Sequence, residues 1–144
     1  MEEANKRLAL RWFTEVWNER FPGAIDELFH PDGVIHSHEA SGWSVAGLDK
    51  LRVFFQRYLE AFPDLRIEVQ EMVAEDDKVA VRCRVTATHL GDGLGLQATG
   101  NRVEITGMSI LRFLEGQVAE VWSNFDVEGL YRQIGTVSRP ARSA

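Results

Sequence analysis

The chain has 144 residues, 44% of them hydrophobic and 26% charged, and a formal net charge of −6 at pH 7. This length and balance are ordinary for one soluble globular domain with a single hydrophobic core. The negative charge argues against nucleic acid as a partner, because neutralising phosphates supplies most of the affinity of proteins for nucleic acids. A single cysteine, Cys83, excludes an intramolecular disulfide and a cysteine-based metal site.

The N-terminal sequence, MEEANKRLALRWF, carries acidic residues at once and interrupts its apolar residues with charges, unlike a signal peptide. No uninterrupted apolar run approaches the length of a membrane span. We therefore expect a cytoplasmic protein that has no membrane partner.

The first part of the chain has the apolar spacing of helices. This spacing predicts one helix over residues 3–18 and a short second helix that ends at His30-Pro31-Asp32-Gly33. A short strand is predicted at Val34–His38, followed by a loop at Glu39–Ala46 that is rich in serine and glycine. A longer helix with one apolar face is predicted at Leu48–Phe62, where a proline follows.

From residue 65 onward the apolar residues alternate, as is typical of strands. The alternation predicts four strands, at Leu65–Ala74, Lys78–His89, Arg102–Leu114 and Gln117–Phe125. Asp126 is a good N-cap for a last short helix at Val127–Ile134. Helices followed by antiparallel strands predict the α+β class, in one domain over residues 1–136 with a frayed tail at 137–144.

Several short segments, in the same order along the chain, carry a family resemblance. They are Glu15-Val16-Trp17-Asn18-Glu19, Leu28-Phe29-His30-Pro31-Asp32, Ala61-Phe62-Pro63-Asp64-Leu65, Thr88-His89-Leu90-Gly91, Ile110–Trp122 and Gly129–Gly135. Together they resemble the SnoaL-like polyketide cyclases, within the superfamily named for nuclear transport factor two. The resemblance implies a cone-shaped α+β barrel, in which a curved and mostly antiparallel sheet wraps around N-terminal helices and encloses a pocket.

The resemblance also assigns positions to the polar groups of the cyclases. Their catalytic aspartate on the last strand falls on Ser123, and two polar residues of the preceding strand fall on Gly107 and Ser109. A serine hydroxyl is too weak a base to replace a carboxylate without an activating partner. In the epoxide-hydrolase branch of the superfamily, two catalytic positions would fall near Cys83 and Val85, neither of which has the required chemistry.

His36 and His38 are the candidate catalytic residues, because alternate residues of a strand share one face and an imidazole can act as a base near neutral pH. The alternative is that this strand is a solvated edge and that both side chains lie on the surface. His36, His38 and Glu39 could also bind a metal, but two residues' spacing is a weak signal for a metal site. We expect neither a metal nor a cofactor.

The remaining pocket residues are predicted from the aromatic residues and from the family positions. Trp43 stands in the predicted loop, where it would cover the pocket or fill one end of the core. Asp126 is interpreted as a helix cap. We expect the pocket to be lined by Trp17, Trp43, Tyr58, Cys83, Gly107, Ser109 and Ser123.

Three functions remain open. The first is an enzyme that acts on a small apolar molecule by isomerisation, cyclisation or hydrolysis. The second is a binding module without catalysis, because Gly107, Ser109 and Ser123 would leave a wider and less polar cavity. The third is a dimeric scaffold. We expect a homodimer through the outer face of the sheet, where Met108, Ile110 and Trp122 would expose apolar surface unless a C-terminal helix covers them.

Overall fold

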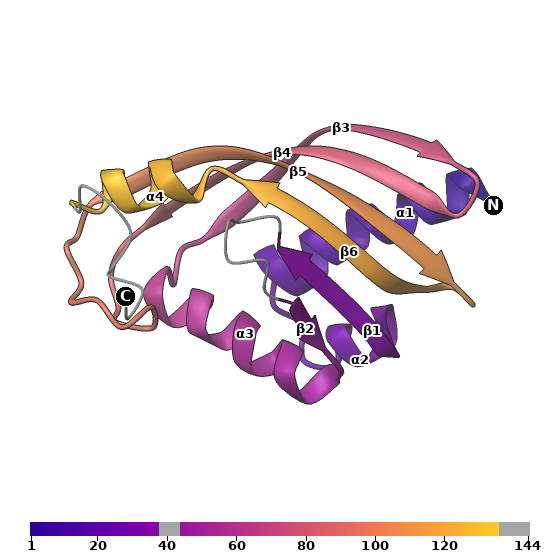
Figure 1. Cartoon of the computed structure of the whole chain (residues 1–144), viewed down its shortest axis with the longest axis horizontal. Helices are drawn as coiled ribbons and strands as arrows, with labels where there is room; N and C mark the ends of the chain where they lie inside the picture. The colour runs from indigo at the N-terminus through magenta and orange to yellow at the C-terminus, as the bar shows by residue number, and fades with distance from the viewer. Residues whose placement is uncertain (38–43, 136–144) are drawn as a thin grey trace.

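Six strands form one curved sheet in the order β2-β1-β6-β5-β4-β3 (Figure 1). The structure is a computed structural model that describes residues 1–37 and 44–135. The strands are β1 (Phe29–Ser37), β2 (Ser44–Ala46), β3 (Arg66–Glu75), β4 (Lys78–Thr88), β5 (Arg102–Leu114) and β6 (Gln117–Phe125). Neighbouring strands are antiparallel except β1 and β6, which are parallel. Within the described residues the sheet is not closed into a barrel, since β2 and β3 are its two edges.

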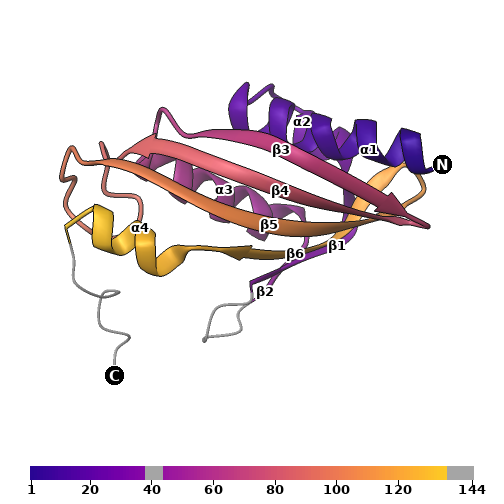
Figure 2. The same cartoon turned by 90° about the horizontal axis from the view of Figure 1, so that it is seen from above.

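The helices cover the inner face of this sheet. They are α1 (Glu2–Arg11), which continues as the π-helical segment η1 (Trp12–Asn18), then α2 (Ala24–Leu28), α3 (Leu48–Ala61) and α4 (Val127–Gln133). Segments α1 and η1 pack against β3, and α3 packs against β1 and β2. Figure 1 shows the long strands arching over α3, and Figure 2 shows α1 and α2 together along one side of the sheet, with α4 at one end. The core therefore lies between the curved sheet and the helices.

Strict alternation along β4 and β5 decides which side chains enter the core. In β4 the alternate residues from Val79 to Ala87 are buried, whereas Arg82 on the other face is exposed. The turn between β5 and β6 uses Glu115 and Gly116, both with positive φ, 54° and 77°. Two central residues in the left-handed region match the right-handed twist of a tight hairpin. The predicted bounds of β5 and β6 are confirmed.

The start of β1 differs from the prediction. The strand begins at Phe29, so the sequence from His30 to Gly33 is extended and does not end a helix. Its pairing with β6 shifts register between Phe29 and Val34. A Cβ atom at Gly33 would lie 2.5 Å from the ring of Phe29, so the glycine allows the irregular strand to pass over this buried ring. Proline and glycine therefore mark an irregularity within the strand.

The first predicted helix is also more complex than expected, because its second half is the π-helical segment η1. Trp12, Phe13 and Val16 of this segment are all buried. The predicted tail at 137–144 lies outside the described residues. None of the helices in the described ranges has the length and apolar character needed to cross a bilayer.

Candidate functional site

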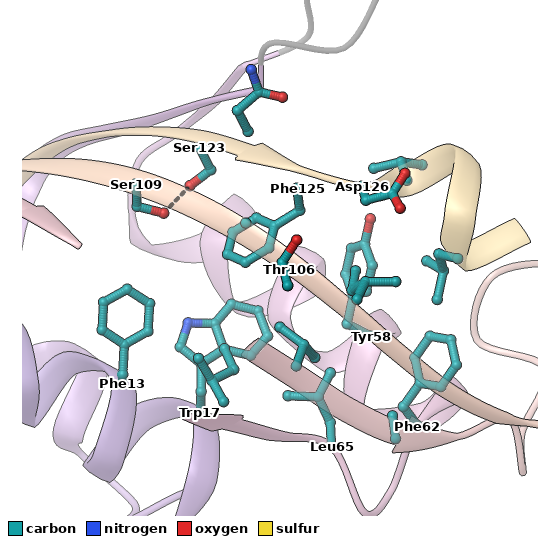
Figure 3. A pocket seen from close by; sticks show the side chains of 18 of the residues that line it. Phe13, Trp17, Tyr58, Phe62, Leu65, Thr106, Ser109, Ser123, Phe125 and Asp126 are labelled. Atoms are coloured by element: carbon teal, nitrogen blue, oxygen red, sulfur yellow. Dashed lines mark hydrogen bonds between the residues drawn. The ribbon is translucent and has the colours of Figure 1, made fainter. Parts of the chain in front are cut away.

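A cavity of about 690 Å³ lies inside the fold, lined by η1, α3 and the inner faces of the strands (Figure 3). This volume falls within the range of small-molecule sites in proteins. Aromatic rings form much of its wall, contributed by Trp12, Phe13, Trp17, Phe54, Tyr58, Phe62 and Phe125. The rings also contact one another: Trp17 lies 4.8 Å from Phe55 and 6.4 Å from Phe54, measured between ring centroids. These contacts join η1 to α3 and fix the helical wall of the cavity.

The strand wall of the cavity carries a pair of serine hydroxyls. Ser109 of β5 and Ser123 of β6 are register partners, and their Oγ atoms are 2.9 Å apart. Each hydroxyl has one proton, so one proton forms the bond within the pair and the other remains. Among the described residues neither hydroxyl has another hydrogen-bond partner. The pair can therefore donate one hydrogen bond to an acceptor atom inside the cavity.

Gly107 and Phe125, the next inward pair along β5 and β6, have a different arrangement. A Cβ atom at Gly107 would lie 2.0 Å from Cδ1 of Phe125, so the ring of Phe125 lies against the glycine backbone. Gly107 therefore does not widen the cavity, and that part of the expectation is wrong. The aromatic ring takes the space that a side chain at position 107 would occupy.

The exposed residues among the cavity lining mark its mouth. They are Thr106, Asn124, Asp126 and Glu128. Among the described residues, the last paired positions of β1 and β6 are Ser37 and Ser123, and β6 continues to Phe125. Asp126 holds the start of α4, because its Oδ1 accepts a hydrogen bond from the Gly129 amide at 2.9 Å.

His36 borders the cavity, but its ring lies on the outer face of the sheet. Ile35, the preceding residue, is 6% exposed and points into the core. Nε2 of His36 is 2.7 Å from Oε2 of Glu120, and the ring stacks on Trp122 with centroids 5.7 Å apart. The structure therefore does not bring this imidazole together with the two serine hydroxyls, which face inward.

Glu120 connects His36 to Arg112. Its Oε1 accepts a hydrogen bond from Nε of Arg112 at 3.1 Å. Burial would raise the pKa of the Glu120 carboxyl, but the hydrogen bonds from His36 and Arg112 outweigh it, so the pKa lies below its ordinary value. The carboxylate is thus held ionised between an imidazole and a guanidinium.

A family model for the SnoaL-like polyketide cyclases matches residues 7–134. The chain belongs to the SnoaL-like polyketide cyclase family. Its curved sheet with helices on the inner face is the cone-shaped fold of that family, with a sheet that remains open. No curated protein sequence matches this SnoaL-like protein.

Similar solved structures support the same family assignment. A proposed SnoaL-like polyketide cyclase from Jannaschia sp. CCS1 is 27% identical, with a TM-score of 0.85, and the match covers 97% of this chain and 95% of that one. AclR, a proposed hydroxylase from Streptomyces galilaeus, is 33% identical, with a TM-score of 0.80 and coverage of 94% and 98%. IdmH, a proposed polyketide cyclase from Streptomyces antibioticus, is 26% identical, with a TM-score of 0.76 and coverage of 92% and 99%.

Most of the other predicted site residues of this SnoaL-like protein line the cavity, but one does not. Trp17, Tyr58, Gly107, Ser109 and Ser123 line the cavity. Cys83 does not, which corrects the prediction: its side chain is fully buried in the core, and its neighbours Val85 and Gly107 line the cavity instead. Burial raises the pKa of the Cys83 thiol to about 11.

Two predicted residues, His38 and Trp43, lie outside the described residues. The same holds for Glu39, so the three-residue metal alternative is untested. Within residues 1–37 and 44–135, no group of three or more histidine, cysteine, aspartate or glutamate side chains could hold a metal ion.

The position of Asp126 beside the cavity is not predicted by the sequence. It was interpreted as a helix cap, and the cap is confirmed, but the same side chain also borders the cavity. Figure 3 shows the Tyr58 hydroxyl pointing toward the end of the cavity where Asp126 lies. The position directly after the last strand was the one available signal, because strand ends and the loops beyond them commonly hold functional groups.

Proposed function

We propose that this SnoaL-like protein binds one small, mainly apolar carbonyl compound in its cavity. The observation that carries the proposal is the Ser109–Ser123 pair, 2.9 Å apart in a wall that is otherwise mainly apolar and aromatic. Its remaining proton would be donated to the carbonyl oxygen of the ligand. The aromatic rings would bury the rest of the molecule, and a volume of about 690 Å³ suits one compound of a few rings.

The matched test compares 2-acetylnaphthalene with 2-ethylnaphthalene, which differ in the carbonyl oxygen. Binding is followed by the fluorescence of Trp12 and Trp17, both of which line the cavity. We expect the double variant Ser109→Ala and Ser123→Ala to weaken binding of the ketone by about two- to tenfold, the size of one net hydrogen bond. Binding of the hydrocarbon should not weaken. Equal losses for both compounds would reject a hydrogen bond from this pair.

Catalysis on the same ligand, by isomerisation, cyclisation or hydrolysis, is the second candidate function. Membership of the family favours it, and so does the presence of Asp126, a carboxylate that borders the cavity. By the resemblance, Ser123 occupies the position of the catalytic acid of the cyclases. Its hydroxyl argues for binding alone. Conversion of a bound ketone, absent in an Asp126→Asn variant and in buffer, would establish catalysis.

We also propose that two copies associate through the outer face of the sheet. Met108 and Ile110 of β5 are 58% and 43% exposed on this face, next to Trp122 of β6. Apolar side chains grouped on an exposed sheet face favour a protein partner. The homodimer is compatible with ligand binding, because the cavity lies on the opposite face.

A further inference from the structure

The cavity presents a hydrogen-bond donor and a hydrogen-bond acceptor along one strand. The Ser109–Ser123 pair, with its Oγ atoms 2.9 Å apart, holds a proton that can be donated into the cavity. Asp126 follows directly after the last residue of β6 and also lines the cavity, at the mouth. An ionised carboxylate only accepts hydrogen bonds, so Asp126 has the opposite hydrogen-bonding character to the serine pair.

The capping role of Asp126 is compatible with contact to a ligand. Its Oδ1 accepts a hydrogen bond from the Gly129 amide at 2.9 Å. The two oxygens of a carboxylate have about four acceptor sites, so one accepted hydrogen bond does not exhaust the group. The glycine also orients it: a Cβ atom at position 129 would lie 2.2 Å from Oδ2, so the carboxylate lies directly against the Gly129 backbone. One side chain can therefore cap α4 and accept a hydrogen bond from a ligand.

The backbone of β5 and β6 fixes the separation between the two polar groups. Ser109 and Ser123 are register partners, and the Asp126 amide donates to the Thr106 carbonyl oxygen at 3.2 Å, so both groups are attached to the same pair of strands. Asp126 comes three residues after Ser123, which at roughly 3.3 Å per residue places it about 10 Å further along. The ring of Phe125 lines the cavity between them (Figure 3). The wall thus presents a donor, an aromatic ring and an acceptor in that order.

We infer that the ligand is an aromatic hydroxyketone, with its carbonyl oxygen at the serine pair and its hydroxyl group at Asp126. This inference rests on the proposed binding function and adds a second polar group, at a defined position, to the ligand. The flat ring system between the two oxygens contacts Phe125. The two oxygens lie somewhat less than about 10 Å apart, because each hydrogen bond spans about 3 Å of the separation.

Three 2-acetylnaphthalenes test the inference, with hydrogen, hydroxyl or methoxy at position 6, across the ring system from the acetyl group. The methoxy group keeps the oxygen but cannot donate a hydrogen bond. Titration calorimetry at neutral pH measures each Kd. In wild-type protein we expect the hydroxyl compound to bind about tenfold more tightly than the methoxy compound, the size of one hydrogen bond to a charged group that keeps contact with solvent.

The decisive variant is Asp126→Asn. Asparagine caps helices as well as aspartate does, but it has one acceptor oxygen, which the cap uses, and its amide group donates. We expect it to reduce the ratio of hydroxyl to methoxy affinity by about fivefold. The Kd of the unsubstituted ketone should not change, which shows that the cavity is intact.

Asp49→Asn is the matched control, since Asp49 is a fully exposed acid on α3 that does not line the cavity. It should leave the ratio of hydroxyl to methoxy affinity unchanged. An equal fall of this ratio in both variants would mean that overall charge is responsible and would overturn the inference.

The outcomes separate the two proposals. If the unsubstituted ketone binds and depends on Ser109 and Ser123, while the hydroxyl and methoxy compounds bind equally well, the inference is wrong and the proposed function stands. A hydroxyl preference that persists in Asp126→Asn also overturns the inference, because another group then causes it. If none of the three compounds binds, both proposals fail together.

Discussion

The ring of Phe125 lies against the backbone of Gly107, its direct partner on the neighbouring strand. The arrangement lets one aromatic side chain cover part of the strand wall between the serine pair and the mouth (Figure 3). A larger residue at position 107 and the observed ring position exclude each other, since their atoms would be 2.0 Å apart.

Gly107→Ala should therefore displace Phe125 and reduce the free energy of unfolding by about 1–3 kcal/mol, the usual cost of adding a methyl group to a filled site. Urea unfolding measures this loss. In a Phe125→Ala background the same substitution should cost clearly less, because the ring that it would strike is absent. An equal loss in both backgrounds would show that Phe125 is not the obstacle.

Glu120 should make the stability of the protein depend on acid pH. Its folded pKa is lowered, so its contribution is complete above the ordinary pKa of 4.5 and is lost as the pH falls through the lowered value. The difference in unfolding free energy between wild type and Glu120→Gln should be largest near neutral pH and should shrink below about pH 4.5. A difference that stays constant down to about pH 3 would contradict this assignment.

Ile110→Lys should convert the proposed homodimer into a monomer, because it places a charge at the centre of the apolar outer face. Light scattering after gel filtration measures the mass of both proteins. Val53→Lys is the control: Val53 is 59% exposed, on α3 rather than on the sheet, and should leave the mass unchanged. A wild-type protein that is monomeric at high concentration would reject the proposal.

Cys83 should not react with a disulfide reagent while the protein is folded. The side chain is 0% exposed, and burial raises the pKa of its thiol to about 11, so very little reactive thiolate forms near neutral pH. Denatured protein should react at once and release one equivalent of the reagent's leaving thiol. Rapid reaction in the native state, slowed by a cavity ligand, would show that Cys83 lines the cavity.

The sequence allowed the C-terminal strands to be predicted closely because two local signals agree there. Alternation in β5 and β6 marks the inward residues, and the Glu115-Gly116 turn begins their pairing; a register shift between Arg112 and Phe113 then brings Ser109 opposite Ser123. In β1 the local signals conflict, since Pro31 and Gly33 are typical of a turn but lie within a paired strand. Pairing with β6 at Phe29 and again from Val34 onward holds this stretch within the strand, and no local pattern contains that information.

The same limit applies to the candidate site. The alternation predicted that His36 and His38 share a face, but the face that is buried depends on pairing with β6, which places His36 beside Trp122. Asp126 had a sufficient local explanation as a helix cap. Its place beside the cavity depends on the path of β6 across the sheet, which the residues around Asp126 cannot reveal.

The parallel pairing of β1 with β6 has a consequence for folding. It joins residues as far apart in the sequence as His36 and Glu120, which are separated by 84 positions, whereas the hairpins from β3 to β6 join near neighbours. Contacts between distant residues carry a larger loop-closure entropy and form slowly. We expect the meander to form first and the first strand to dock afterwards, so that a chain still in synthesis has no cavity until its last strand has emerged.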